Sequence, residues 1–406
     1  MNRLFFSLAL LVLSFVVAPA QGVDGDWHGA LSVGSAKLNL VFHFSEGKCT
    51  MDSPDQGAKG IPAELLYNEN DSLSVTVSAI GAAYRARLSE GKLLGTFSQN
   101  GMSFKLDMVP GGIVRNRPQT PTPPLPYQTQ EISFKNEEDG ATLTGTLTTP
   151  FFVKNAPLVV FVSGSGQQNR DEELFEHKPF AVIADRLAKL GIASFRYDDR
   201  GVGKSDGIRA DLTTDDFKKD ALCAIKMLRE KGYGKIGIIG HSEGGLIAFM
   251  IAGEQPSSVD FIVSLAGSAV SGEKILIRQV MDQAKRLGQE ITTAQAKANV
   301  QMTASSQPWY DFFVKYDPAA AIGKIQCPVY AANGSKDVQV YADENIGALK
   351  KLLNVKPEDR IIVYEGLNHL FQHASTGQPE EYAEIEETFS EEVISDISEW
   401  IKTISK

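Results

Sequence analysis

The sequence IGIIGHSEGGLIAFM, residues 236–250, carries the strongest structural signal in this chain. Its first residues form a short apolar run that is typical of a buried strand, and its last residues predict a helix. Between them lies the pattern G-x-S-x-G. Gly240 and Gly244 permit a sharp strand-turn-helix that lifts a serine hydroxyl clear of the sheet. We therefore predict that Ser242 is a catalytic nucleophile.

Further short apolar runs occur on both sides of this stretch, separated by helical segments. Such runs suit strands of a mostly parallel sheet that helices cover on both faces. Apolar stripes beginning at Phe180 and at Val393 predict two of these helices. The sequence thus predicts an α/β domain over residues 128–406. Its expected strands are Glu131–Lys135, Thr142–Thr148, Leu158–Val162, Ala193–Arg196, Ile236–Ile239, Phe261–Leu265, Val329–Ala332 and Ile361–Tyr364.

A serine hydroxyl is a poor nucleophile unless a base takes its proton. His369 follows the predicted strand Ile361–Tyr364, so a loop can present it at the carboxyl edge of the sheet, where Ser242 is expected. We predict that His369 is the base. We interpret His373 as a packing or surface histidine, since no third residue has the spacing of a metal ligand beside this pair.

The base needs a carboxylate that fixes its tautomer. Asp337 lies on the loop after the predicted strand Val329–Ala332, and we predict that it is this acid. Glu365 is the rival acid, but it lies only a few residues before His369. The order Ser242, Asp337, His369 is the α/β-hydrolase order of such a triad.

The negative charge that develops on the attacked oxygen needs two backbone donors. One is predicted to be the amide of Glu243, next to the nucleophile. The other should come from the glycine-containing loop Ser163–Gly166, with the amide of Ser165 as the prediction and that of Gly166 as the alternative. The polar run Gln167–Glu173 either braces this loop or is a solvated charge cluster.

Two further segments are interpreted structurally. Helical sequence at residues 267–323 interrupts the alternation of strands and helices, and we expect it to form a cap that shapes the substrate pocket. The segment Arg200–Ser205 contains the Gly-Lys-Ser of a phosphate-binding loop. The first glycine of that motif would fall on Asp198, however, and no apolar helix follows, so we interpret the segment as a turn.

The N-terminal residues predict a secretory signal. Arg3 precedes the apolar run Leu4–Val17, which is followed by Ala18-Pro19-Ala20, a typical cleavage pattern. We expect residues 1–20 to be removed, Gln21 to be the mature N-terminus, and the protein to be periplasmic or extracellular. No other stretch is apolar enough to span a membrane.

Residues 21–110 show alternating apolar and polar residues, which predict the strands of a small antiparallel barrel or sandwich. Asn100-Gly101 is a strong hairpin signal within it. Five prolines lie in residues 111–127, which we interpret as an extended spacer between two domains, or alternatively as a strap along the second domain.

Charge and cysteine content narrow the possible functions. Lys and Arg total 40 against 50 Asp and Glu, which gives a net charge of −10. This acidic balance argues against a nucleic-acid partner and favours a small or neutral substrate. Cys49, Cys223 and Cys327 are far apart in the sequence and imply no disulfide framework.

Taken together, the motifs of residues 127–406 resemble those of secreted bacterial α/β-hydrolases of the carboxylesterase type. The resemblance implies a serine acyl hydrolase without metal or cofactor, with Ser242, Asp337 and His369 as nucleophile, acid and base. Ser163 departs from the family pattern, because many relatives have a histidine there. The matching segments are Gly240–Gly245, Ser163–Gly166, Asp198–Ser205, Gly334–Asp337 and Asn368–His369.

The expected activity is hydrolysis of small or short-acyl esters through an acyl-enzyme. One alternative is a serine peptidase of the prolyl or dipeptidyl type, because such peptidases share this triad. Another is a glycan-directed esterase that is recruited to its polymer by the N-terminal β-domain. A purely non-catalytic role is disfavoured by the intact order of serine, acid and base.

Overall fold

The computed structural model describes residues 23–33, 36–56, 58–69, 71–113 and 115–406, and the expected signal peptide at residues 1–20 lies outside these ranges. The chain divides after Val114 into two units, each with a hydrophobic core of its own. Among the helices of the described ranges, none is long and apolar enough to cross a membrane.

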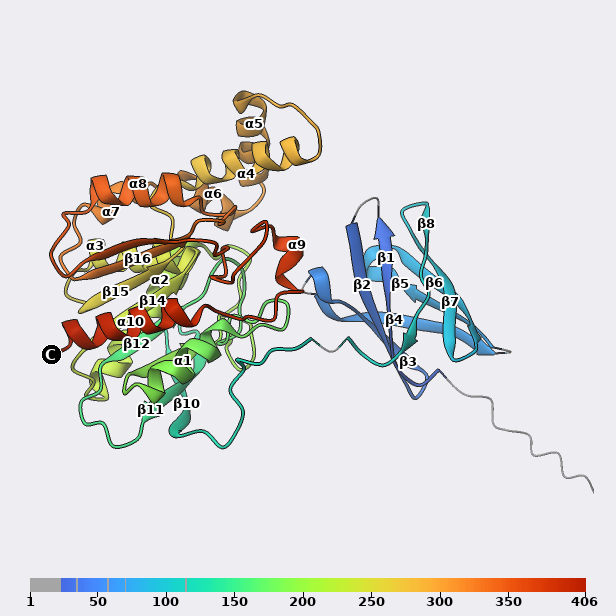
Figure 1. Ribbon diagram of the computed structural model, residues 1–406, viewed down its shortest axis with the longest axis horizontal. Coiled ribbons are helices and arrows are strands. Elements are labelled where there is room, and N and C mark those ends of the chain that lie inside the picture. The colour runs from blue at the N-terminus through green and yellow to red at the C-terminus, as the bar shows by residue number, and fades with distance from the viewer. Residues whose placement is uncertain (1–22, 34–35, 57, 70, 114) are drawn as a thin grey trace, which may run out of the picture. The chain divides into compact units, whose positions relative to one another are not determined.

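The described part of the N-terminal unit is an antiparallel sheet with the strand order β8-β7-β6-β5-β4-β3-β2-β1-β9 (Figure 1). Met108 forms a bridge with Leu93 of β7 while Val109 of β9 pairs with His28 of β1, so the sheet curls toward closure as a half-barrel. The expected small β-domain is therefore present. Its elements are β1 Gly25–Val33, β2 Ala36–Ser45, β3 Lys48–Ser53, η1 Pro54–Gln56, β4 Ala58–Glu69, β5 Ser72–Val77, η2 Ser78–Ile80, β6 Ala82–Ser89, β7 Lys92–Gln99, β8 Met102–Lys105 and β9 Val109–Pro110.

The C-terminal unit is built on a sheet with the strand order β10-β11-β13-β12-β14-β15-β16-β17. β11 pairs antiparallel with β10 and β13, and the later strands pair in parallel. The prediction of a mostly parallel sheet is confirmed, and the strands extend the predicted ranges by at most a few residues. They are β10 Tyr127–Lys135, β11 Thr142–Pro150, β12 Leu158–Val162, β13 Ala193–Tyr197, β14 Ile236–His241, β15 Phe261–Leu265, β16 Val329–Gly334 and β17 Arg360–Tyr364.

Helices cover both faces of this sheet because its central strands are apolar on both sides. In β12, Leu158 and Val160 pack into one core with α2, α3 and α8, whereas Val159 and Phe161 pack into the other with α1 and α10. Successive side chains of a strand point to opposite faces, which explains this division. The helices are α1 Pro179–Lys189, α2 Thr214–Glu230, α3 Glu243–Glu254, α8 Ala342–Leu352 and α10 Glu391–Ile404.

The expected cap is an insertion of helices between β15 and β16. Figure 1 shows α4, α5 and α6 gathered in one group, and Val300, Ala304 and Val314 form a small apolar cluster within it. The cap helices are α4 Gly272–Arg286, α5 Thr293–Ala304, α6 Pro308–Lys315 and α7 Ala319–Ile322, and a short α9 at Pro379–Tyr382 follows later in the chain.

The proline-rich segment from residue 115 onward lies along the C-terminal unit. The guanidinium of Arg117 donates hydrogen bonds to the carbonyl oxygens of Phe175, Ala383 and Ile385 at 2.7–2.9 Å. The side chain of Gln119 accepts hydrogen bonds from the backbone N–H groups of Thr388 and Phe389. These contacts favour the strap interpretation for the part of the segment around Arg117 and Gln119.

Candidate active site

Ser242 lies at the sharp turn between β14 and α3. Its backbone has φ 53° and ψ −115°, a conformation that few non-glycine residues adopt. The flanking glycines are needed because a Cβ on Gly240 would lie 2.0 Å from the carbonyl oxygen of Gly244, and a Cβ on Gly244 would lie 2.0 Å from that of Val162. The Ser242 side chain is only partly buried, so its hydroxyl can be reached.

The predicted base and acid are in contact. Nδ1 of His369 lies 2.9 Å from Oδ2 of Asp337, and both side chains are buried. Oδ1 of Asp337 accepts hydrogen bonds from the backbone N–H groups of Gln339 and Val340, each at 2.8 Å, which fix the carboxylate. This geometry leaves Nε2 of His369 for proton transfer. The rival acid Glu365 is exposed.

His373 is not part of this pair. Its side chain is exposed, and its Nδ1 lies 2.8 Å from Oε2 of Glu387. This position agrees with the interpretation of His373 as a surface histidine.

The loop Ser163–Gly166 lies against the nucleophile, since a Cβ on Gly164 would lie 3.3 Å from Cβ of Ser242. The amide of Gly164 already donates a 2.6 Å hydrogen bond to Oε1 of Glu172. The amides of Ser165 and Gly166 are the next donors along this loop. The amide of Glu243 is one of the first N–H groups of α3, which have no partner within their helix.

His241, the residue before the nucleophile, links this loop to the base. Its Nδ1 lies 3.0 Å from Oε1 of Glu172 and its Nε2 lies 2.9 Å from the carbonyl oxygen of His369. The two imidazole rings are 4.8 Å apart. A carboxylate and a carbonyl are both acceptors, so this arrangement favours the imidazolium form of His241, in which both ring nitrogens donate.

The surroundings of this pair support that protonation state. Burial opposes the charged ring most strongly, but the Glu172 carboxylate, the carbonyl oxygen of His369 and the Asp337 carboxylate together raise the pKa of His241 above its usual value. Glu172 itself is buried. The pair therefore ties the backbone of the base to the loop beside the nucleophile through two charge-assisted hydrogen bonds.

A second buried carboxylate holds both ends of this loop. Oδ2 of Asp199 accepts hydrogen bonds from Oγ of Ser163 and from the backbone N–H of Gln168, both at 2.9 Å. Burial raises the pKa of Asp199 to about 8. Ser163 thus fastens the loop through its hydroxyl.

The side chain of Glu243 connects the elbow to the cap. Its Oε1 accepts hydrogen bonds from Oγ1 of Thr214 at 2.6 Å and from Nε1 of Trp309 at 2.8 Å, and the carboxylate also bonds the Ser165 side chain. Burial raises the pKa of the Glu243 carboxyl. The expected contact of the cap with the site is made by Trp309 of α6.

A cavity of about 580 Å³ lies beside Ser165, and we name it the Trp309 cavity. The described residues that line it include no aspartate or glutamate. They are Ser165, Gly166, Gln167, Ile208, Arg209, Leu212, Phe217, Gln307 and Trp309. Trp309 also stacks on Phe313, with ring centroids 5.7 Å apart and planes at 6°.

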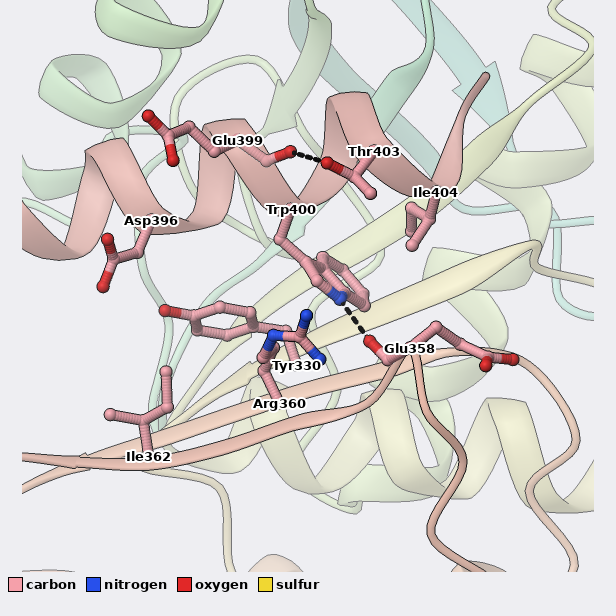
Figure 2. A pocket seen from close by; sticks show the side chains of 9 residues that line it. All are labelled: Tyr330, Glu358, Arg360, Ile362, Asp396, Glu399, Trp400, Thr403 and Ile404. Carbon is pink, nitrogen blue, oxygen red and sulfur yellow. Dashed lines mark hydrogen bonds between the residues drawn. The ribbon is translucent and has the colours of Figure 1, made fainter.

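A cavity of about 340 Å³ lies between β17 and α10 (Figure 2). It is lined by Arg360, the first residue of β17, and by Trp400 and Thr403 near the end of α10. Because His369 follows the other end of β17, this cavity lies at the opposite edge of the sheet from the predicted base.

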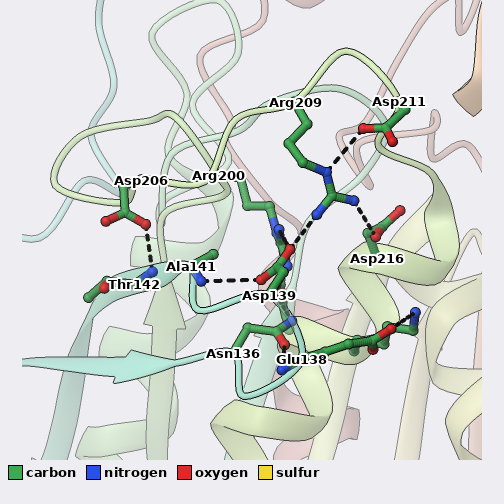
Figure 3. Close-up of polar contacts among 12 residues, drawn as sticks. Asn136, Glu138, Asp139, Ala141, Thr142, Arg200, Asp206, Arg209, Asp211 and Asp216 are labelled. Carbon is green, nitrogen blue, oxygen red and sulfur yellow. Dashed lines mark hydrogen bonds and ion pairs between the residues drawn. The ribbon is translucent and has the colours of Figure 1, made fainter.

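The segment that resembles a phosphate-binding loop is held by internal contacts (Figure 3). The buried Arg200 forms 2.7 Å bonds with both carboxylate oxygens of Asp220 and also bonds Asp139. Oγ of Ser205 donates to the carbonyl oxygen of Asp198. The hydrogen bonds of these side chains stabilise the turn between β13 and α2. This agrees with the interpretation of the segment as a turn.

The run Gln167–Glu173 is a brace. Nε and one terminal nitrogen of Arg170 bond the two carboxylate oxygens of Asp198, and Asp171 bonds Arg196. Sequence reasoning pointed to this run without identifying Glu172 as its functional member. A buried acid cannot be told from a solvated one by composition, and the only signal in the sequence was that Glu172 lies a few residues after a glycine-containing loop.

Comparisons with known proteins bear on the C-terminal unit. The sequence profile of a family described as serine aminopeptidase, S33, matches residues 175–385, just over half of the chain. The esterase EstD of Thermotoga maritima is 26% identical over 295 residues, 68% of this chain and 70% of EstD. The human serine hydrolase BPHL is 26% identical over 186 residues, 43% of this chain and 60% of BPHL.

Solved structures also resemble this chain, at a lower sequence identity than these relatives. Est1E of Butyrivibrio proteoclasticus, solved with ferulic acid bound, aligns with a TM-score of 0.48 and 18% identity. The alignment covers 68% of this chain and all of that chain.

Proposed function

The chain belongs to the serine hydrolase family described as serine aminopeptidase, S33, and we propose that it is a carboxylic-ester hydrolase that uses Ser242, Asp337 and His369. The observation that carries the proposal is the buried 2.9 Å contact between His369 and Asp337, at the edge of the sheet where the elbow presents Ser242. The similarity to EstD, named as an esterase, supports the ester as substrate.

The proposed reaction uses these residues as follows. Oγ of Ser242 attacks the ester carbonyl carbon while Nε2 of His369 takes its proton. The amides of Ser165 and Glu243 bind the oxygen that becomes negative. When the carbonyl re-forms, the C–O bond to the alcohol breaks and His369 returns the proton to the leaving oxygen. Water then attacks the acyl-enzyme by the same route and releases the acid.

The family's description makes an aminopeptidase the second candidate. Such an enzyme must hold the protonated amine of its substrate, and a buried charge requires a paired partner. Along the described lining of the Trp309 cavity no carboxylate is present, and the nearby Glu243 carboxylate already accepts three hydrogen bonds. This arrangement favours an ester with an uncharged acyl group.

We propose further that the protein acts outside the cytoplasm, in the periplasm or extracellularly. The support is the sequence of residues 1–20, with a positive residue, an apolar run and Ala18-Pro19-Ala20. N-terminal sequencing of the protein from its native host tests this. A first residue of Gln21 is expected, and a chain that retains residues 1–20 in the cytoplasm would contradict export.

The activity is tested with p-nitrophenyl esters of increasing acyl length beside aminoacyl p-nitroanilides, with Ser242→Ala as the blank. Ester turnover that depends on Ser242 is the expected result. Turnover of anilides without comparable ester turnover would overturn the proposal in favour of a peptidase.

A further inference from the structure

We propose that the Trp309 cavity is the acyl-binding pocket and that it accepts a bulky, uncharged, preferably aromatic acyl group. This inference rests on the proposed ester hydrolysis and adds the class of acid that is released. Ser165, the predicted oxyanion donor, lines this cavity, whereas Ser242 and His369 are not among its described lining residues, so the cavity lies beside the expected place of the ester carbonyl.

The order of the strands decides which part of the ester enters this cavity. Its lining comes from the loop that follows β12, from the loop and helix α2 that follow β13, and from the cap. Those two strands lie on one side of β14, whereas β16 and β17, whose loops carry Asp337 and His369, lie on the other. Since His369 must protonate the leaving oxygen, the alcohol faces β17. The acyl group consequently extends toward β12 and β13, into the Trp309 cavity.

The lining determines the kind of acyl group. Ile208, Leu212, Phe217 and Trp309 supply apolar and aromatic surface. The indole is held in place by its bond to Glu243 and by its stacking on Phe313, so it forms a preorganised wall.

Arg209, the one charged residue in the described lining, is already neutralised. Its guanidinium donates to Asp211 at 3.0 Å and to Asp216 at 2.9 Å, and it also bonds Asp139 (Figure 3). The cavity therefore offers neither a free cation for an acidic acyl group nor a carboxylate for an amino-acyl group. Its volume of about 580 Å³ is far more than an acetyl group requires.

The test compares p-nitrophenyl acetate with p-nitrophenyl phenylacetate in the full-length protein. We expect the wild type to prefer phenylacetate. In Ile208→Asp and Phe217→Ala, kcat/KM for phenylacetate should fall by about tenfold or more, the scale on which a hydrophobic pocket discriminates. The readout is the ratio of kcat/KM for phenylacetate to kcat/KM for acetate, which should fall in both variants. Ile208 is 63% exposed, so its substitution leaves the fold intact.

Leu287→Asp is the matched control, because Leu287 is 66% exposed and lies outside the cavity lining. This variant should change kcat/KM for neither phenylacetate nor acetate. A second set of substrates tests the alcohol side. It keeps the acetyl group and compares the p-nitrophenyl ester with the ester of the bulkier naphthol.

If both cavity variants leave the phenylacetate to acetate ratio unchanged, the acyl assignment is overturned while ester hydrolysis stands. If they change the ratio between alcohols instead, the cavity binds the alcohol and the assignment is also overturned. Absence of Ser242-dependent hydrolysis of every ester in the wild type would instead remove the proposed function itself.

Discussion

Asp337 lies 32 residues before His369 in the sequence, and Glu365 lies much closer, yet the more distant acid makes the contact. The adjacent parallel strands β16 and β17 bring together the loops that carry Asp337 and His369. The backbone amides of Gln339 and Val340 donate hydrogen bonds to the Asp337 carboxylate. Glu365 is exposed. Proximity in the sequence is therefore a poor guide to the acid of such a pair.

Asp337→Asn should lower kcat by about 10⁴-fold, because an amide favours the wrong tautomer of the base. Glu365→Gln, the matched variant at the rival acid, should leave kcat within about twofold. Both are measured on p-nitrophenyl acetate. Equal damage by the two substitutions would contradict the assignment of Asp337.

Glu172→Gln should impair positioning while leaving the reacting groups in place. The substitution removes the charge that stabilises the His241 imidazolium and weakens the acceptor of the Gly164 amide. We expect kcat to fall by up to about 10²-fold, which is the effect of misplacing a catalytic group by about 1 Å. KM should stay within about threefold of the wild-type value.

The pH profile separates this role from a purely structural one. Because Glu172 helps to raise the pKa of His241, this residue should lose its proton at a lower pH in Glu172→Gln than in the wild type, which should add a new step to the kcat profile. A kcat profile that is lowered uniformly, with no new step, would contradict the positioning role.

At the scale of the element, the loop Ser163–Gln168 is fixed by three carboxylates, of which Glu172 follows it closely in the sequence and Asp199 and Glu243 lie farther away. Asp199 holds its two ends, Glu172 holds its second residue, and Glu243 bonds the Ser165 side chain. A loop with this sequence has no regular secondary structure to hold it, so these bonds replace the ladder of a strand or helix.

Asp199 should make stability depend on pH in a defined direction. Its pKa is about 8 in the native protein and near 4 when unfolded, so between these values the native state binds one more proton than the unfolded state. The free energy of unfolding therefore falls as pH rises through this window. Asp199→Asn removes that contribution, because the amide is always neutral.

The measurement is urea unfolding of the wild type and Asp199→Asn at pH 5 and pH 8. The free energy of unfolding of the variant relative to the wild type should increase with pH. Parallel behaviour of the two proteins would show that Asp199 is ionised in the native state across this range.

At the scale of the whole molecule, the two units have separate cores, and the predicted triad and the Trp309 cavity belong to the second unit. The strap is also held by that unit through Arg117 and Gln119. The sheet of the first unit contributes no residue to the described geometry of the site.

Deletion of residues 22–109 should therefore leave kcat/KM for p-nitrophenyl acetate within about twofold. Loss of action on an esterified polymer with unchanged hydrolysis of the small ester would support recruitment by the β-domain. Loss of small-ester hydrolysis in a protein that is still folded by circular dichroism would contradict the independence of the second unit.

Much of the C-terminal fold could be predicted because its signals are local. Buried strands such as Leu158–Val162 are continuous apolar runs, and Gly240 and Gly244 mark a turn that only glycine permits. The strap was harder to predict. Its prolines specify an extended chain but not what that chain packs against, which depends on carbonyl groups near residues 175 and 383–385.

The α/β order, the elbow at Ser242 and the candidates Asp337 and His369 could be predicted from the chain alone, because each depends on residues close together in the sequence or on strand order. The folded protein was needed to show that Glu172 and Asp199 are buried supports of one loop and that Trp309 contacts Glu243. Their importance comes from burial and from partners far away in the sequence. A carboxylate's role depends on whether water or protein surrounds it, and the chain specifies this only when it folds.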